Sequence, residues 1–189
     1  MNSRAEAVAA TMRRAVQLDQ QWQRKVPEDD RRYTPWMPFS TPAFVALLAE
    51  AMPEAQPAGG DIRFLDIGCG PGSKMLIARD LFGLDATGFD RVPEYVAAAR
   101  SLGLDAHDAD AGHYAAYGRF QVIWFNRVAR DAAIQARIEA KIWRDAADGT
   151  LVICANLEDR PPSSWFPVLD DWDDRRGIWV KPGVPAGGW

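Results

Sequence analysis

Short apolar runs alternate with longer amphipathic stretches along the second two thirds of the chain. The apolar runs have the length and the β-branched or aromatic content of buried strands. They lie at 64–67, 86–90, 104–109, 120–125 and 150–155. The intervening stretches have the apolar periodicity of helices, at 73–82, at 93–102 and around 134–142. Strands that alternate with such helices predict an α/β fold, a doubly wound and mostly parallel sheet with helices on both faces.

The N-terminal part of the chain has a different pattern. Val8, Met12 and Val16 recur at four-residue steps, which predicts the buried face of a helix that begins near Ser3. Thr41-Pro42 is typical of the N-cap and first turn of a second helix. These two segments predict a helical arm that precedes the sheet.

Residues after the fifth predicted strand are less regular. The acidic run 170–174 and the prolines at 161–162 are typical of loops, and Gly177–Lys181 is the one convincing strand. We therefore expect a sheet of about six to seven strands. The chain divides into an arm and lid segment over 1–58 and a single domain over 59–189.

A glycine-rich loop, Asp66-Ile67-Gly68-Cys69-Gly70-Pro71-Gly72, follows the first predicted strand. In a doubly wound sheet this loop lies at the carboxyl ends of the strands, where ligands bind. A dinucleotide fingerprint requires a third glycine where this chain has Ser73. The carboxylate of Asp66 would repel a pyrophosphate but suits a cationic ligand.

The segment Phe64–Gly72 resembles the glycine loop of class I (Rossmann-like) S-adenosylmethionine-dependent methyltransferases, and the resemblance extends over about residues 62–155. It implies S-adenosylmethionine as the cofactor and methyl transfer as the activity. In that family an acid after the second strand binds the ribose, residues after the third strand contact adenine, and a residue after the fourth strand faces methionine and substrate. The cofactor-binding residues that the resemblance implies are Asp66, Gly68, Cys69, Gly70, Gly72, Asp90, Arg91, Asp108, Ala109 and Asn126.

Two parts of the resemblance leave alternatives open. Asp110 could replace Asp108 if the third strand ends two residues later. Members of the family commonly end with a helix and an antiparallel strand pair. Because so few residues follow Ala155, we expect the sixth strand to be very short or missing.

Methyl transfer from a sulfonium requires alignment of donor and acceptor more than acid–base chemistry. No catalytic residue is therefore required by the sequence, and Asn126 and His113 are the candidates. His113 is either a general base or a surface histidine. Tyr33, Trp36 and Phe39 form a candidate lid, whose aromatic rings would either shield the sulfonium or anchor the arm.

Composition limits the classes of acceptor and partner that we expect for the protein. The formal net charge of −4 over 189 residues gives no general attraction for nucleic acid, which makes nucleic acid a less favoured acceptor. We expect a small-molecule acceptor, with a protein lysine side chain as the alternative, or a non-catalytic module that only binds S-adenosylmethionine. The two cysteines have no metal-ligand spacing, so no metal is expected. The same two cysteines suggest no disulfide framework, which predicts a reduced, cytoplasmic location. The absence of long apolar runs predicts no membrane partner.

Overall fold

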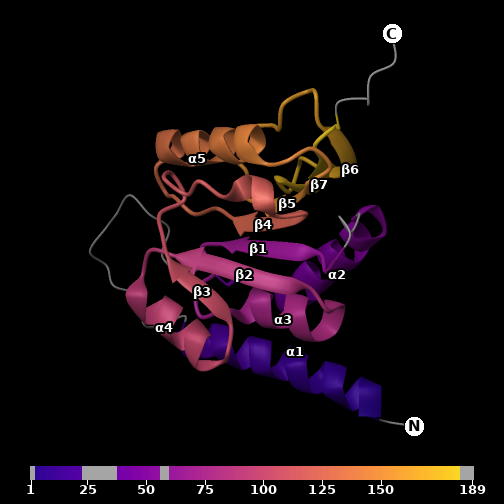
Figure 1. Cartoon of the computed structure of the whole chain (residues 1–189), viewed down its shortest axis with the longest axis vertical. Coiled ribbons are helices and arrows are strands. Elements are labelled where there is room, and N and C mark those ends of the chain that lie inside the picture. The colour runs from indigo at the N-terminus through magenta and orange to yellow at the C-terminus, as the bar shows by residue number, and fades with distance from the viewer. Residues whose placement is uncertain (1–2, 23–37, 56–59, 184–189) are drawn as a thin grey trace.

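A computed structural model of the chain describes residues 3–22, 38–55 and 60–183. The described helices are α1 (Ser3–Trp22), α2 (Thr41–Ala51), α3 (Ser73–Phe82), α4 (Pro93–Ser101) and α5 (Ala132–Asp145), with short 3-10 turns η1 (Met52–Glu54) and η2 (Tyr117–Arg119). The strands are β1 (Arg63–Ile67), β2 (Asp85–Asp90), β3 (Asp105–Asp108), β4 (Val122–Asn126), β5 (Leu151–Ala155), β6 (Phe166–Asp171) and β7 (Arg176–Val180). All strands belong to one sheet, which has helices on both faces (Figure 1).

The strand order is β3-β2-β1-β4-β5-β7-β6. Strands β1 to β5 are parallel to one another, whereas β7 is antiparallel to both of its neighbours, β5 and β6. The order reverses between β1 and β4, so a crevice for a ligand is expected above the carboxyl ends of these two strands. The predicted doubly wound, mostly parallel sheet is confirmed.

The sheet separates two apolar cores. Phe64, Trp124 and Ile153 point to the face that α2, α3 and α4 cover. Leu65 and Ile123 point to the opposite face, where α5 packs. This alternation along parallel strands that are buried on both faces is the reason that their sequences read as continuous apolar runs.

The expectation of a short or missing sixth strand is wrong. Strand β6 is six residues long, and it includes part of the acidic run that we predicted to be a loop. Asp171 lies opposite Arg176 on β7, and the Arg176 Nη2 to Asp171 Oδ2 distance is 2.7 Å. Asp170 pairs with Arg160. These partners offset the acidic charge and allow the hairpin to form, while residues 156–165 contain no helix.

Helix α1 packs on α3 through a face that is rotated from the predicted one. Met12 of the predicted face is half-buried, but Val8 and Val16 are exposed, at 42% and 36%, whereas Ala15 and Asp19 are buried. Asp19 is on the buried face because it forms an ion pair with Lys74 of α3. Apolar periodicity alone cannot reveal a helix face that includes a buried charge.

The start of α2 also differs from the prediction by one residue. The N-cap is Ser40, whose Oγ accepts a hydrogen bond from the backbone N–H of Ala43 at 3.4 Å. Thr41 lies in the first turn, where its hydroxyl donates to Asp19 at 3.4 Å instead of capping the helix. This contact connects α2 to α1.

Candidate cofactor site

The candidate residues gather at the carboxyl edge of the sheet. The glycine loop follows β1, and Asp90, Asp108 and Asn126 are the last residues of β2, β3 and β4. Because β1 to β4 are parallel neighbours, these strand ends lie along one edge. The structure therefore brings together the strand ends that the sequence singled out.

The glycine loop rests on the end of β2. The backbone N–H groups of Gly68 and Cys69 both donate to the carbonyl oxygen of Phe89, each at 2.9 Å. Gly68, Gly70 and Gly72 have φ values of 71°, 52° and 89°, in the left-handed region that disfavours side chains. The loop's glycines are thus required by its backbone path.

Asp90 links this loop to β2. Its Oδ2 accepts a hydrogen bond from the Gly70 N–H and its Oδ1 accepts one from the Val92 N–H, both at 2.9 Å. Burial raises the pKa of Asp90, and hydrogen bonds from Val92, Gly70 and Arg91 oppose that rise. Each carboxylate oxygen has a further lone pair, so Asp90 can accept two hydroxyl groups of a ligand without releasing the loop.

Asp66 is buried at the end of β1, with 2% of its surface exposed. Burial raises its pKa to about 8; Lys74 lowers the pKa, whereas Asp90 and Asp19 raise it further. Its Oδ2 has no hydrogen-bond partner among the described residues. A buried carboxyl with an unused oxygen at the edge of this site is suited to a cationic ligand group.

Cys69 and Arg91, two further candidate cofactor-binding residues, differ in their exposure to solvent. The Cys69 side chain is buried, and burial raises the pKa of its thiol well above the ordinary value. A neutral, buried thiol is no nucleophile, so Cys69 offers a ligand its backbone alone. Arg91 follows Asp90 directly and is exposed.

The loop after β3 holds Asp108, Ala109 and Asp110. Asp108 is exposed, and the Ala109 N–H donates to the carbonyl oxygen of Asp90 at 3.1 Å, which places this segment beside β2. The Asp110 carboxylate accepts the Gly112 N–H at 2.8 Å and lies 3.1 Å from His113 Nδ1. Asp110 therefore stabilises its own turn. The His113 side chain is 91% exposed at the rim.

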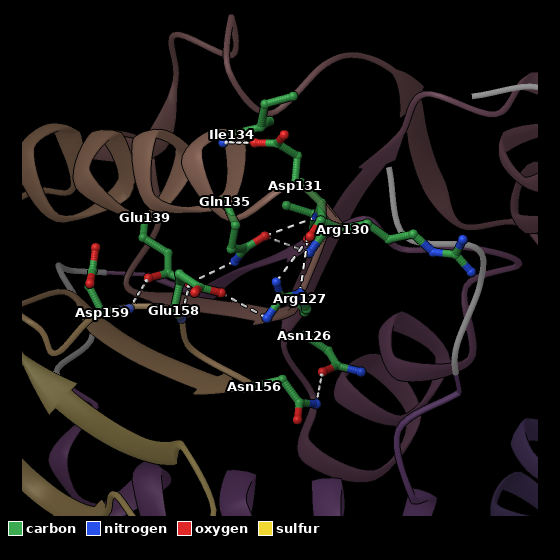
Figure 2. Close-up of polar contacts among 12 residues, drawn as sticks. Asn126, Arg127, Arg130, Asp131, Ile134, Gln135, Glu139, Asn156, Glu158 and Asp159 are labelled. Atoms are coloured by element: carbon green, nitrogen blue, oxygen red, sulfur yellow. Dashed lines mark hydrogen bonds and ion pairs between the residues drawn. The ribbon is translucent and has the colours of Figure 1, made fainter. Parts of the chain in front are cut away.

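Asn156 is a residue that sequence reasoning missed. Its Nδ2 donates to Oδ1 of Asn126 at 2.7 Å, which joins the ends of β4 and β5 (Figure 2). Asn156 has a φ of 56°, a left-handed conformation that is uncommon for residues other than glycine. Two signals in the sequence could have indicated it. Asn156 directly follows the fifth predicted strand, and asparagine tolerates this conformation.

A buried polar network supports the loop that follows Asn126. The Gln135 Oε1 accepts the N–H groups of Val128 and Ala129 at 3.0 and 2.9 Å, and its Nε2 donates to Glu139 at 2.7 Å. Val128 in turn packs against the glycine loop, because a Cβ at Gly68 would lie 3.0 Å from its Cγ1. The network thus fixes the loop after β4 against the glycine loop.

The same network reaches the loop after β5. Glu139 accepts the backbone N–H groups of Glu158 and Asp159 at 2.9 and 3.1 Å, and Arg127 pairs with Glu158 at 2.9 Å (Figure 2). Burial raises the pKa of Glu139, and these hydrogen bonds oppose the rise. Glu139 therefore holds the loop after β5 directly and the loop after β4 through Gln135.

Of the candidate lid, Tyr33 and Trp36 lie outside the described residues. Phe39 packs on Trp124 of β4, with ring centroids 5.1 Å apart. This contact agrees with the hydrophobic anchoring that we considered for this segment. Within residues 3–22, 38–55 and 60–183, no cluster of histidine, cysteine and acidic side chains is arranged to hold a metal ion. No helix in these ranges is long and apolar enough to cross a membrane.

Comparisons by sequence give no match, neither to a protein-family model nor to a curated protein. By structure, the chain is similar to an RNA methyltransferase from Salinibacter ruber in complex with S-adenosyl-L-homocysteine, with a TM-score of 0.58 and 16% identity over 80% of this chain and 98% of that chain. It is also similar to the N-methyltransferase NodS from Bradyrhizobium japonicum, with a TM-score of 0.53 and 12% identity over 75% and 96% of the two chains.

A third similar structure is phosphoethanolamine N-methyltransferase 2 from Haemonchus contortus, in complex with S-adenosyl-L-methionine. The TM-score is 0.48 at 22% identity, and the match covers 60% of this chain but 27% of that longer one. The first two structures match over nearly their whole length, and the strand order of this chain has the reversal of a doubly wound sheet. The chain has the fold of the class I S-adenosylmethionine-dependent methyltransferases.

Proposed function

We propose that this chain is an S-adenosylmethionine-dependent methyltransferase that binds its donor above the carboxyl ends of β1 and β2. The observation that carries the proposal is the Asp90 carboxylate, which is held at the carboxyl end of β2, beside the glycine loop, by the Gly70 and Val92 N–H groups. A buried carboxylate fixed in this way is preorganised to accept the two hydroxyls of a ribose.

The remaining donor contacts follow from the neighbouring groups. The adenine would lie toward Asp108 and Ala109 beside β3, and the methionine ammonium toward Asp66. Asp66, Asp90 and Asp108 make this edge acidic, which suits a donor that has an ammonium and a sulfonium but no phosphate. The S-adenosyl-L-homocysteine bound in the similar RNA methyltransferase from Salinibacter ruber supports this choice of cofactor.

The chemistry is an in-line displacement. A lone pair of the acceptor attacks the methyl carbon, the carbon–sulfur bond breaks, and its electron pair stays on sulfur to give S-adenosylhomocysteine. Alignment of the acceptor with this bond supplies most of the rate. Asn126, at the end of β4 and bonded to Asn156, is the candidate for orienting the acceptor, and the exposed His113 is the candidate for removing a proton at the rim.

We propose a small molecule as the acceptor. Support comes from the excess of acidic over basic residues, which disfavours a nucleic-acid acceptor. A protein lysine is the second candidate acceptor, and an S-adenosylmethionine-binding module without turnover is the second candidate function. A panel of acceptors separates these candidates.

The test combines calorimetry with a transfer assay. S-adenosylhomocysteine should bind the wild-type protein, and Asp90→Ala should weaken binding by about 2–3 kcal/mol, the worth of hydrogen bonds to a charged group. Asp80→Ala, at an exposed position on α3, is the matched control and should bind normally. Unchanged affinity in folded Asp90→Ala would overturn the ribose assignment.

The transfer assay follows tritium from S-[methyl-³H]adenosylmethionine into small amines, phenols and thiols, into lysine-containing peptides, and into RNA. Transfer to a small molecule supports the proposed acceptor. Transfer to peptide or RNA alone overturns that acceptor class, and tight donor binding without transfer to any of them indicates a binding module.

A further inference from the structure

A buried ion pair joins the N-terminal helix to the helix that follows the glycine loop. The Lys74 Nζ lies 2.9 Å from Asp19 Oδ2, and the two side chains are 3% and 9% exposed. Lys74 also donates to Ser73 Oγ at 3.3 Å, and Thr41 donates to the same Asp19 oxygen at 3.4 Å. Asp19 therefore fixes the position of the Lys74 ammonium.

Asp66 lies close enough to this pair for both charges to act on it. It belongs to the face of β1 that carries Phe64, the face on which α3 packs. Both Asp19 Oδ1 and Asp66 Oδ2 are buried without a hydrogen-bond partner among the described residues. The cluster thus has two buried carboxyl groups and one ammonium, so that a second positive charge would be favourable there when both carboxyl groups are ionised.

We propose that Asp19 is a positioning residue for the donor site. Asp19 binds the Lys74 ammonium and so leaves Asp66 available to the ammonium of the donor. This inference rests on the proposed function. Without Asp19, the Lys74 ammonium would be left beside Asp66, a buried carboxyl on which its charge already acts. The protein's own ammonium would then compete with that of the donor. The N-terminal helix would thereby contribute to donor binding without touching the donor.

The charges that face Asp66 determine what each variant should do. They are Lys74 from α3, Asp19 from α1 and Asp90 from β2, with the neutral Cys69 thiol in the loop. Its neighbours in register are Gly88 on β2 and Trp124 on β4, which are uncharged. Asp19 raises the pKa of Asp66 and Lys74 lowers it. Removing Asp19 should therefore lower the pKa of Asp66 from about 8, and removing Lys74 should raise it.

The experiment compares wild type, Asp19→Asn and the double variant Asp19→Asn/Lys74→Met. The pKa of Asp66 is measured by carbon-13 carboxyl NMR in the free protein, and the affinity for S-adenosylhomocysteine is measured by calorimetry at pH 9, where Asp66 is largely ionised. Asp19→Asn should lower the pKa of Asp66 and weaken binding by about tenfold, the effect of roughly one charged hydrogen bond. The double variant removes the competing ammonium and should recover most of the lost affinity.

Asp80→Asn, on the exposed side of the helix α3 that carries Lys74, is the control. It should change neither the pKa of Asp66 nor the affinity for S-adenosylhomocysteine. The inference is overturned if Asp19→Asn folds with an unchanged Asp66 pKa, or if its affinity loss persists in the double variant, since either result assigns Asp19 a purely structural role. A wild-type protein that does not bind S-adenosylhomocysteine overturns the proposed function instead. The NMR measurement still decides whether Asp19 controls the charge of Asp66.

Discussion

Replacing Gly88 with alanine tests whether the glycine loop rests directly on β2. Gly88 lies opposite Asp66 in the sheet, and a Cβ at this position would lie 2.5 Å from Met75 Sδ and 2.8 Å from Cys69 Cβ. The flexible Met75 side chain can move aside. Cys69 Cβ is attached to the loop backbone, so the loop itself must move away from β2 and weaken the 2.9 Å hydrogen bond from Gly70 to Asp90.

The expected cost is that of overpacking a buried site by one methyl group, about 1–3 kcal/mol. For a chain of this length, that corresponds to a decrease of about 2–12 °C in the melting temperature. Gly60→Ala is the matched control, because a Cβ there meets no atom within 4 Å in the part of the chain that the structure describes. Calorimetric unfolding measures stability. Titration with S-adenosylhomocysteine measures ligand affinity, which should decrease if the glycine loop is displaced. A Gly88→Ala protein with wild-type stability and affinity would refute the seating of Cys69 on β2.

Three further predictions concern buried or strained groups. Glu139→Ala removes the acceptor of three hydrogen bonds and should lower the free energy of unfolding, measured in urea, by about 3 kcal/mol; an unchanged value would contradict the network. Asn156→Gly replaces a residue in the left-handed conformation with glycine, which adopts it without strain, so the stability of the protein should be unchanged or higher. The loss of the amide beside Asn126 should raise KM for the acceptor and leave donor affinity unchanged. Arg175→Gly, at the other left-handed residue (φ of 50°), is the control and should leave KM unchanged. Burial raises the pKa of Asp66 to about 8, so the folded protein favours the protonated carboxyl. The contribution of Asp66 to stability is therefore present near pH 4 and is lost as the pH rises through about 8. The melting temperature of Asp66→Asn should exceed that of the wild type at pH 9 but not at pH 4.

The parallel part of the fold was predictable because each signal in it is local. Gly83 follows the predicted end of α3 and has a φ of 69°, which ends the helix where the sequence indicates. The glycine loop and Asp90 were predictable for the same reason, since buried strands that end in glycine or aspartate mark the carboxyl edge of the sheet.

The rest depends on contacts between residues far apart in the sequence. Strand β6 was missed because its acidic end is compensated by Arg176 on β7 and not by any pattern within the strand. The buried face of α1 was mispredicted because Asp19 is paired with Lys74, a partner that a helical pattern cannot indicate. Asn156 became a candidate only when pairing of β4 with β5 placed it beside Asn126.

The most direct test of the proposed donor site is a crystal structure of the protein with S-adenosylhomocysteine. We expect both ribose hydroxyls on the Asp90 carboxylate, the adenine beside Asp108 and Ala109, and the ammonium at Asp66. The sulfur should then point toward Asn126 and Asn156, where the acceptor would bind. A ligand bound elsewhere, or bound in this crevice with its ribose away from Asp90, would contradict the proposed donor site.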